Sequence, residues 1–413
     1  MGMGRPSSPD LHRSLVDKLV SFGLIRSPSV EAALRAVPRH LFLPEEPLER
    51  AYADEAIPTK LLNGIAISSA SQPAIVAVML EQLELQPGHR VLEIGAGTGY
   101  NAALMAHIVG ETGHVITLDI DEDIVASARN HLAAAGYERV QVVLTDGTHG
   151  YPEAAPYDRI VLTVAAADLY PAWSDQLTRG GRLLLPLRIR GDIQRVVAFE
   201  PRGDHLESVS VQEGGFMPLR GEAAWRPERL NAIDSSLQIS LTVVDGPSLD
   251  AEDARRLLAS PVRESSAGVR LKMRGEIWGS LDLWLALRDQ RACVLYARDE
   301  AAAREDLPWL VGEPGKWSFT LGLIGRAGLA LLTRPPDQLE AGAHDFEPLI
   351  RSYGAAADLA QRLVELLRSW DAAGRPSSAT LRIKAYPRQG GCVPVPEEVT
   401  IEKPLTRLVL QWD

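Results

Sequence analysis

The feature that most constrains the fold is an apolar strand that runs directly into three closely spaced glycines. The stretch reads VLEIGAGTGY from Val91 to Tyr100, with Glu93 inside the strand. The glycines are Gly95, Gly97 and Gly99. Glycine has no Cβ, so such a loop turns tightly and lets a ligand approach the backbone. A helical pattern over residues 101–109 follows, and together these segments predict the first unit of an α/β sheet.

The spacing of these glycines indicates which cofactor the loop binds. The third glycine falls four positions after the first, which gives G-x-G-x-G. The dinucleotide fingerprint G-x-G-x-x-G places it five positions after the first. The shorter spacing favours S-adenosyl-L-methionine over NAD.

Acidic residues end the next two predicted strands. Residues 114–119 end in Asp119, which is followed by Ile120 and where a carboxylate can accept hydrogen bonds from both ribose hydroxyls. Residues 140–144 lead into Asp146 and Gly147, where an acidic side chain can meet the adenine amino group. Each feature has a structural alternative: a tight turn for the glycines, a helix cap for Asp119 and an Asx-turn for Asp146. The glycine loop, Asp119 and Asp146 occur in order at the ends of three successive predicted strands. This order favours a cofactor site, which we expect also to include Glu93.

The order of predicted elements indicates a doubly wound, Rossmann-like class I methyltransferase sheet. Strands and helices alternate between residues 90 and 187, and a hairpin over 194–212 follows. We expect a methyltransferase domain over residues 1–220, with a helical entry segment over 10–65 that ends in an irregular stretch. Seven of the eight tryptophans lie beyond it. Residues 221–413 are predicted to form an additional α+β domain, an accessory and peptide-binding one, with a helix over 355–370.

Composition excludes several classes of function. The chain has 43 basic and 54 acidic residues and a net charge of −11, which argues against a nucleic-acid partner. No apolar run approaches the roughly 20 residues of a membrane span, and the first residues lack the apolar core of a secretory signal. A cytoplasmic location is expected. The two cysteines, Cys293 and Cys392, form no metal-binding spacing, so no metal site is expected.

Several blocks in register resemble the protein-L-isoaspartate O-methyltransferase family. The resemblance extends from about Leu11 to Leu219. Its blocks are VPRHLFLP (37–44), AYADEAIP (51–58), SASQP (69–73), GGRLLLP (180–186) and FMPL (216–219). It implies the class I fold, S-adenosyl-L-methionine as cofactor, and a carboxylate in a peptide or protein as methyl acceptor. Ser69 matches a family threonine, and Ser68 and Ser69 are expected near the cofactor.

Ser71 is the expected catalytic residue, in contact with the substrate. It precedes a helix predicted to open at Pro73, and helix N-termini present free N–H groups and a positive dipole to anions. The alternative is that its hydroxyl only caps that helix. A carboxylate with a pKa near 4 is already ionised at neutral pH. The absence of an obvious general base is therefore expected.

Two departures from the family pattern affect the substrate expectation. Ile67 and Ser68 replace the usual glycine-glutamine pair, and roughly 190 residues follow the core. The layout is similar to extended homologues that accompany ribosomally made lanthipeptides and ATP-grasp-crosslinked peptides (graspetides). That resemblance implies methylation of a precursor-peptide aspartate, leading to a succinimide (aspartimide) and isoaspartate. General isoaspartate repair, or an inactive cofactor-binding protein that presents a peptide, remain the alternatives.

Overall fold

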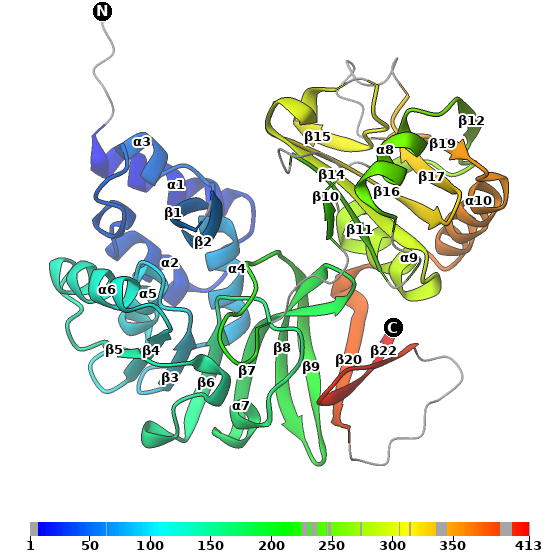
Figure 1. Ribbon diagram of the computed structural model, residues 1–413. Helices are drawn as coiled ribbons and strands as arrows, with labels where there is room; N and C mark the ends of the chain where they lie inside the picture. Colours follow the sequence, from blue (N-terminus) through cyan, green and yellow to red (C-terminus); the bar gives the residue numbers. More distant parts are fainter. Residues whose placement is uncertain are drawn as a thin grey trace, which may run out of the picture.

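The structure is a computed structural model with two lobes (Figure 1), and one hydrophobic core contains buried residues of both. It describes residues 7–62, 64–224, 230–232, 238–244, 246, 249–272, 275–304, 306–313, 315–335, 345–388 and 399–412. Trp225 and Cys392 lie outside these ranges. The helices of the first lobe are α1 (Ser8–Ser21), α2 (Pro28–Ala36), α3 (Leu48–Ala51), α4 (Pro73–Leu83), α5 (Tyr100–Val109), α6 (Glu122–Ala134) and α7 (Pro171–Asp175). Its strands are β1 (Ile57–Leu62), β2 (Ile65–Ala70), β3 (Arg90–Ile94), β4 (His114–Asp119), β5 (Gln141–Leu144), β6 (Tyr157–Leu162), β7 (Leu177–Arg190), β8 (Ile193–Arg202) and β9 (His205–Glu213).

The first lobe is built on a sheet whose parallel part confirms the predicted α/β alternation. The strand order across this part is β7-β6-β3-β4-β5, all parallel, and β8 and β9 continue it as the predicted antiparallel hairpin. Val91 and Leu92 of β3 are fully buried because helices cover both faces. Residues of α1, α2, α4, α5 and α6 share a core with one face, and Trp173 of α7 packs on the other.

The stretch expected to be irregular before Gly64 contains a β-hairpin instead. Strands β1 and β2 pair antiparallel, from Ile57 opposite Ala70 to Leu62 opposite Ile65. Pro58 obscures the pattern, but a two-stranded ribbon tolerates proline because each strand is an edge. The hairpin places Ser68 and Ser69 on β2, immediately before α4.

The second lobe contains an eight-stranded sheet backed by helices, in agreement with the α+β prediction. Its strand order is β10-β11-β14-β16-β17-β19-β12, with β15 paired to β16. These strands are β10 (Leu230–Ala232), β11 (Ile239–Val243), β12 (Val262–Ser266), β14 (Ala292–Arg298), β15 (Val311–Glu313), β16 (Trp317–Gly325), β17 (Gly328–Thr333) and β19 (Leu349–Gly354). The helices are α8 (Ala251–Leu258), α9 (Asp282–Arg288) and α10 (Ala357–Ala372), and the short strands β13 (Leu271–Lys272) and β18 (Asp345–Phe346) form a separate pair. Helix α10 confirms the helix predicted over 355–370.

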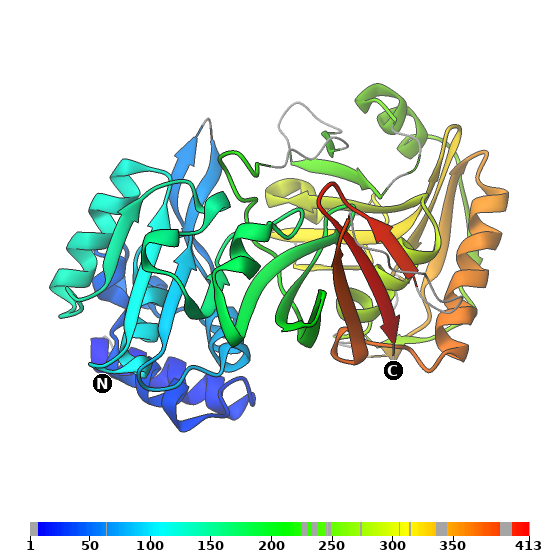
Figure 2. The ribbon, with the colours of Figure 1, turned by 90° about the horizontal axis from the view of Figure 1, so that it is seen from below.

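The last strands of the chain join the sheet of the first lobe. The predicted domain boundary at residue 220 does not anticipate this arrangement. Strands β20 (Leu381–Pro387), β21 (Val399–Glu402) and β22 (Thr406–Trp412) extend that sheet beyond β9 to ten strands (Figures 1 and 2). The carboxylate of Asp168 accepts hydrogen bonds from Leu405 N and Thr406 Oγ1, so the β21–β22 turn is held against the first lobe. The domain division 1–220 and 221–413 stays a prediction, with residues 381–412 structurally part of the first sheet.

A buried ion pair also joins the lobes. Arg195 of β8 lies 2.8 Å from Asp282 of α9, and its Nε donates to Ser378 Oγ at 2.7 Å. Both charged side chains are almost fully buried. None of the helices in the described ranges combines the length and apolar character that crossing a bilayer requires.

Candidate active site

A pocket of about 860 Å³ opens at the carboxyl ends of β3, β4 and β6. This is where α/β sheets bind their ligands. The pocket brings together most of the predicted site residues: Ser68, Ser69, Ser71, Glu93, Gly95, Gly97, Asp119, Ile120 and Gly147. Gly99 and Asp146 do not line it.

The glycines of the β3–α5 loop serve different purposes. Gly95 has φ +105°, and a Cβ there would lie 2.4 Å from Thr163 Oγ1, whose hydroxyl donates to the Gly95 carbonyl at 2.6 Å. Gly97, with φ +50°, leaves its surface open to the pocket. Gly99 packs instead against α6, because a Cβ there would meet Leu132 at 3.1 Å. Gly99 therefore allows α6 to pack closely, and its contact with the cofactor stays a prediction, while Gly95 and Gly97 form the floor of the pocket.

Asp119 is held in position by backbone N–H groups at the end of β4. Its Oδ2 accepts from Gly97 N at 3.2 Å and its Oδ1 from Ile120 N at 2.9 Å. Burial raises the pKa of this carboxyl. Oδ1 also accepts from Asp121 N at 3.3 Å, so it is Oδ2 that has a further lone pair for a ribose hydroxyl. The Ile120 side chain beside it is 38% exposed, an apolar surface against which an adenine ring can pack.

The Asp146 carboxylate is bonded to neighbouring residues and does not line the pocket. Its Oδ1 accepts from Thr148 N at 2.9 Å and from Thr148 Oγ1 at 2.6 Å, and its Oδ2 accepts from Glu222 N at 2.8 Å. The carboxylate thus forms the Asx-turn, and the contact of its side chain with adenine stays a prediction. Gly147 lines the pocket in its place, with a Cβ position only 2.3 Å from Ile94 Cγ2 that excludes larger residues.

Glu93 is a fully buried acid within the pocket lining. Its Oε1 accepts from Asn101 Nδ2 at 2.7 Å and its Oε2 from Thr117 Oγ1 at 2.6 Å. Burial raises its pKa to about 7, because removing water disfavours the ionised form more than these two bonds favour it. Glu93 therefore fixes the strand-to-helix junction and changes charge near neutral pH.

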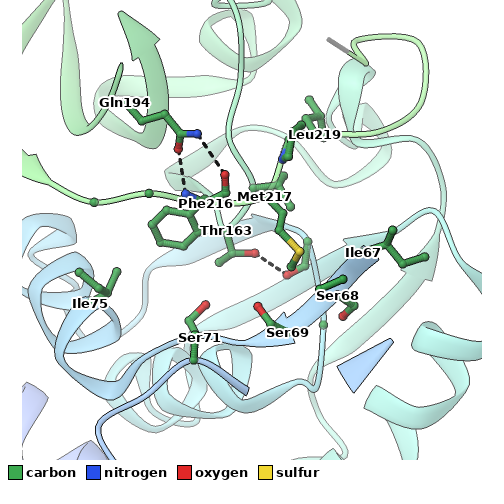
Figure 3. A pocket seen from close by; sticks show the side chains of 18 of the residues that line it. Ile67, Ser68, Ser69, Ser71, Ile75, Thr163, Gln194, Phe216, Met217 and Leu219 are labelled. Carbon is green, nitrogen blue, oxygen red and sulfur yellow. Dashed lines mark hydrogen bonds between the residues drawn. The ribbon is translucent and has the colours of Figure 1, made fainter. Parts of the chain in front are cut away.

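The Ser71 hydroxyl does not cap α4. The helix begins at Pro73, and it is Asp54 whose Oδ1 accepts from Ala74 N, at 2.9 Å. Gln72, at the capping position, donates instead to the Asp54 carbonyl at 3.1 Å. Figure 3 shows the hydroxyls of Ser69 and Ser71 pointing into the cavity below Phe216. The role of Ser71 toward substrate stays a prediction, but the competing capping role is not realised.

A buried arginine positions this segment. Arg39, in the VPRHLFLP block, is fully buried and donates to the carbonyls of Ala51, Ala53, Glu55 and Ser71. It thereby links the entry helices to the turn before α4. Ser68, less exposed than Ser69, has its hydroxyl occupied by Thr59 Oγ1 at 3.1 Å.

Other pocket residues carry no recognisable sequence signal. Gln194 donates to the Phe216 carbonyl at 3.1 Å and accepts from Phe216 N at 2.8 Å, which fixes residues 214–219 above Ser71 (Figure 3). Further lining residues come from the second lobe: Ser240, Thr242, Val244, Trp278, Asp282, Val294, Tyr296 and Leu321. Among these further pocket residues, only those of the FMPL block were singled out by the sequence analysis.

The donor set fits S-adenosyl-L-methionine. A glycine floor, a carboxylate for the ribose and an apolar side chain for the adenine meet in one cavity. Within the described ranges, no three histidine, cysteine, aspartate or glutamate side chains gather in a metal-binding arrangement.

Comparisons with known proteins agree with this site. The sequence model of the protein-L-isoaspartate(D-aspartate) O-methyltransferase family matches residues 10–224. A protein-L-isoaspartate O-methyltransferase of Hyperthermus butylicus is 42% identical over 225 residues, which cover 52% of this chain and 91% of that protein. The enzyme of the same name from Methanopyrus kandleri is 42% identical over 215 residues, 51% of this chain and 92% of the relative.

Two solved structures are similar as well. One protein-L-isoaspartate O-methyltransferase structure covers 90% of this chain and 96% of its own, with a TM-score of 0.49 and 24% identity. A Plasmodium falciparum structure described by the same activity, in complex with S-adenosyl-L-homocysteine, covers 51% and 98%, with a TM-score of 0.45 and 21% identity. On the family match and the curated relatives, the chain belongs to the protein-L-isoaspartate O-methyltransferase family of S-adenosyl-L-methionine-dependent enzymes.

Proposed function

We propose that the protein methylates the carboxylate of an isoaspartyl or aspartyl residue in a peptide or protein. The observation that carries this proposal is the position of Ser69 and Ser71. Their hydroxyls face the cavity from the end of β2 and from the turn before α4, in the same pocket as Gly97 and Asp119. Each of these hydroxyls can donate a hydrogen bond to an oxygen of a carboxylate acceptor placed there.

The residues of the chain supply placement rather than proton transfer. When bound, S-adenosyl-L-methionine supplies an electrophilic methyl group. The acceptor carboxylate, with a pKa near 4, is ionised without a base. Ser71 would orient one carboxylate oxygen, in line with the methyl carbon at about 3–3.5 Å. Phe216 and Ile75, which line the same cavity, would keep water from the reacting oxygen.

The reaction is balanced without a further reactant. The carboxylate oxygen forms a bond to the methyl carbon as the carbon–sulfur bond breaks, giving a methyl ester and S-adenosyl-L-homocysteine. The backbone nitrogen of the next residue can then attack the ester carbonyl and lose its proton, and methanol leaves. The product is a succinimide, which water opens to aspartate or isoaspartate.

We further propose that the substrate is a ribosomally made precursor peptide with an aspartyl acceptor. The family match ends at residue 224, yet side chains from β11 and β14, beyond it, line the same pocket. Because the second lobe adds side chains to the pocket, we expect the protein to accept a narrower range of peptides than a general repair enzyme must accept. Repair of isoaspartate in damaged proteins remains the second candidate, since the curated relatives match only about half of this chain.

Paired peptides test both candidates. The protein is incubated with S-adenosyl-L-methionine and with isoaspartyl and aspartyl versions of one sequence, including precursor peptides encoded beside its gene, and masses are followed. Gain of one methylene followed by loss of methanol, on an aspartyl precursor, supports maturation. Exclusive use of isoaspartyl peptides supports repair. Tight cofactor binding with no methyl ester on any peptide would contradict both and favour a binding protein.

A further inference from the structure

One face of the second lobe's sheet contributes side chains to the pocket. Ser240 pairs with Tyr296, and Thr242 pairs with Val294, across β11 and β14. Directly opposed residues in neighbouring strands project to the same side of a sheet. All four line the pocket. Their neighbours Leu241, Val243, Cys293 and Leu295 project to the opposite side, where they are buried in a core of their own.

The turn between β7 and β8 places a carboxylate against this face. A Cβ on Gly191 would lie 3.1 Å from Val244 Cα, so the turn packs tightly on the end of β11. Asp192 follows, lines the pocket and accepts a hydrogen bond from the Thr242 hydroxyl. Burial raises the pKa of Asp192. The hydrogen bond from Thr242 and the positive charge of Arg188 act in the opposite direction and favour the ionised carboxylate.

Two aromatic rings complete this end of the pocket. Trp278 is 45% exposed and packs edge-on against Phe319, with ring centroids 4.7 Å apart. Tyr296 is 38% exposed. Both line the pocket, and exposed faces of indole and phenol rings attract cations. The other pocket acid at this end, Asp282, is already neutralised by Arg195 at 2.8 Å.

From this arrangement we propose that Asp192, Thr242, Trp278 and Tyr296 form a flanking subsite that binds a lysine or arginine side chain of the peptide substrate. The residue bound lies close in sequence to the acceptor carboxylate. The inference rests on the proposed function and narrows its substrate class to peptides with a basic residue beside the acceptor.

The subsite is continuous with the reaction site. Asp192 is two residues from Gln194, which fixes the loop above Ser71. The shared cavity of about 860 Å³ lies near the upper end of the roughly 300–1,000 Å³ that a single small ligand occupies. Gly97 and Asp119 of the cofactor site and Asp192 of the subsite line this same cavity, so the two sites open into each other.

A peptide panel tests the proposal on the full chain. Acceptor peptides of equal length carry lysine, norleucine or glutamate at one position, scanned over the residues on either side of the acceptor, and kcat/KM is measured. We expect lysine at one position to exceed norleucine by about tenfold and glutamate to fall below both. The Asp192→Asn variant should lose the lysine advantage, so that its kcat/KM values for the lysine and norleucine peptides become equal.

Two further variants keep the test independent of folding. Asp204→Asn, which alters an exposed acid in the β8–β9 turn, is the matched control and should keep the lysine preference. Asp192→Lys should reverse the order, so that the glutamate peptide becomes the better substrate. That reversal cannot come from a protein that fails to fold.

The outcomes separate this inference from the proposed function. Methylation of lysine, norleucine and glutamate peptides with equal kcat/KM at every position would overturn the subsite and leave the function intact. If no peptide is methylated, the function fails, and the subsite is then judged by calorimetric binding of the same peptides. Equal affinities would overturn it, and tighter binding of the lysine peptide, lost in Asp192→Asn, would support it.

Discussion

Burial of Glu93 makes the stability of the first lobe depend on pH in a defined direction. Its pKa is raised from an ordinary 4.5 to about 7, since its carboxyl is enclosed between β3, β4 and α5. The folded protein therefore binds a proton that the unfolded chain has already released. Below pH 4.5 the residue is protonated in both states, so its ionisation does not affect the free energy of unfolding. Between pH 4.5 and 7 the unfolded chain ionises while the folded state keeps its proton, so the free energy of unfolding falls by about 3 kcal/mol in total, at 1.36 kcal/mol per factor of ten, and changes no further above pH 7.

The Glu93→Gln variant isolates this effect. A glutamine can accept from Asn101 through its oxygen and donate to the Thr117 hydroxyl through its nitrogen, so both observed contacts keep a partner. The free energy of unfolding is measured with urea on cofactor-free protein between pH 5 and 8.5. As pH increases, the value for the variant should rise relative to that of the wild type by up to about 3 kcal/mol, and the difference should then stay constant. A difference that stays constant with pH, or that grows toward acid, would refute the reasoning.

Three further substitutions probe the pocket. Asp119→Ala should weaken S-adenosyl-L-methionine binding roughly tenfold to a hundredfold in calorimetry by removing the acceptor for the ribose, with Asp119→Asn intermediate; unchanged affinity would contradict this. Ser71→Ala should lower kcat without lowering the melting temperature, because its hydroxyl is not a cap; a fall in melting temperature alone would contradict the assignment. Asp54→Ala should instead cost about 1 kcal/mol of unfolding free energy in urea titrations, because Ala74 N loses its acceptor.

The parallel sheet and its cofactor floor were predictable because each depends on local sequence. Strands β3 and β4 have the predicted bounds, since continuous apolar runs ended by glycine or aspartate specify buried strands. The same local signals set the positions of Gly95, Gly97 and Asp119. Asp146 could not be placed in this way, because its partner Glu222 is 76 residues away.

The rest of the pocket depends on contacts between distant segments. The β1–β2 hairpin is masked by Pro58, and the Gln194 bonds to Phe216 have no local pattern. The return of β20 to pair with β9, far away in sequence, is set by edge pairing that any exposed strand can offer. For these reasons the pocket residues that the second lobe contributes could not be predicted from the sequence.

The most direct test of the account follows the transferred methyl group itself. The protein is incubated with donor labelled in the methyl carbon and with an isoaspartyl or aspartyl peptide, and the product is fragmented by mass spectrometry. The account predicts label in a base-labile ester on the acceptor carboxyl, absent when Asp119→Ala protein is used at a low donor concentration. Label on a nitrogen or sulfur atom, or none on any carboxyl oxygen, would contradict it.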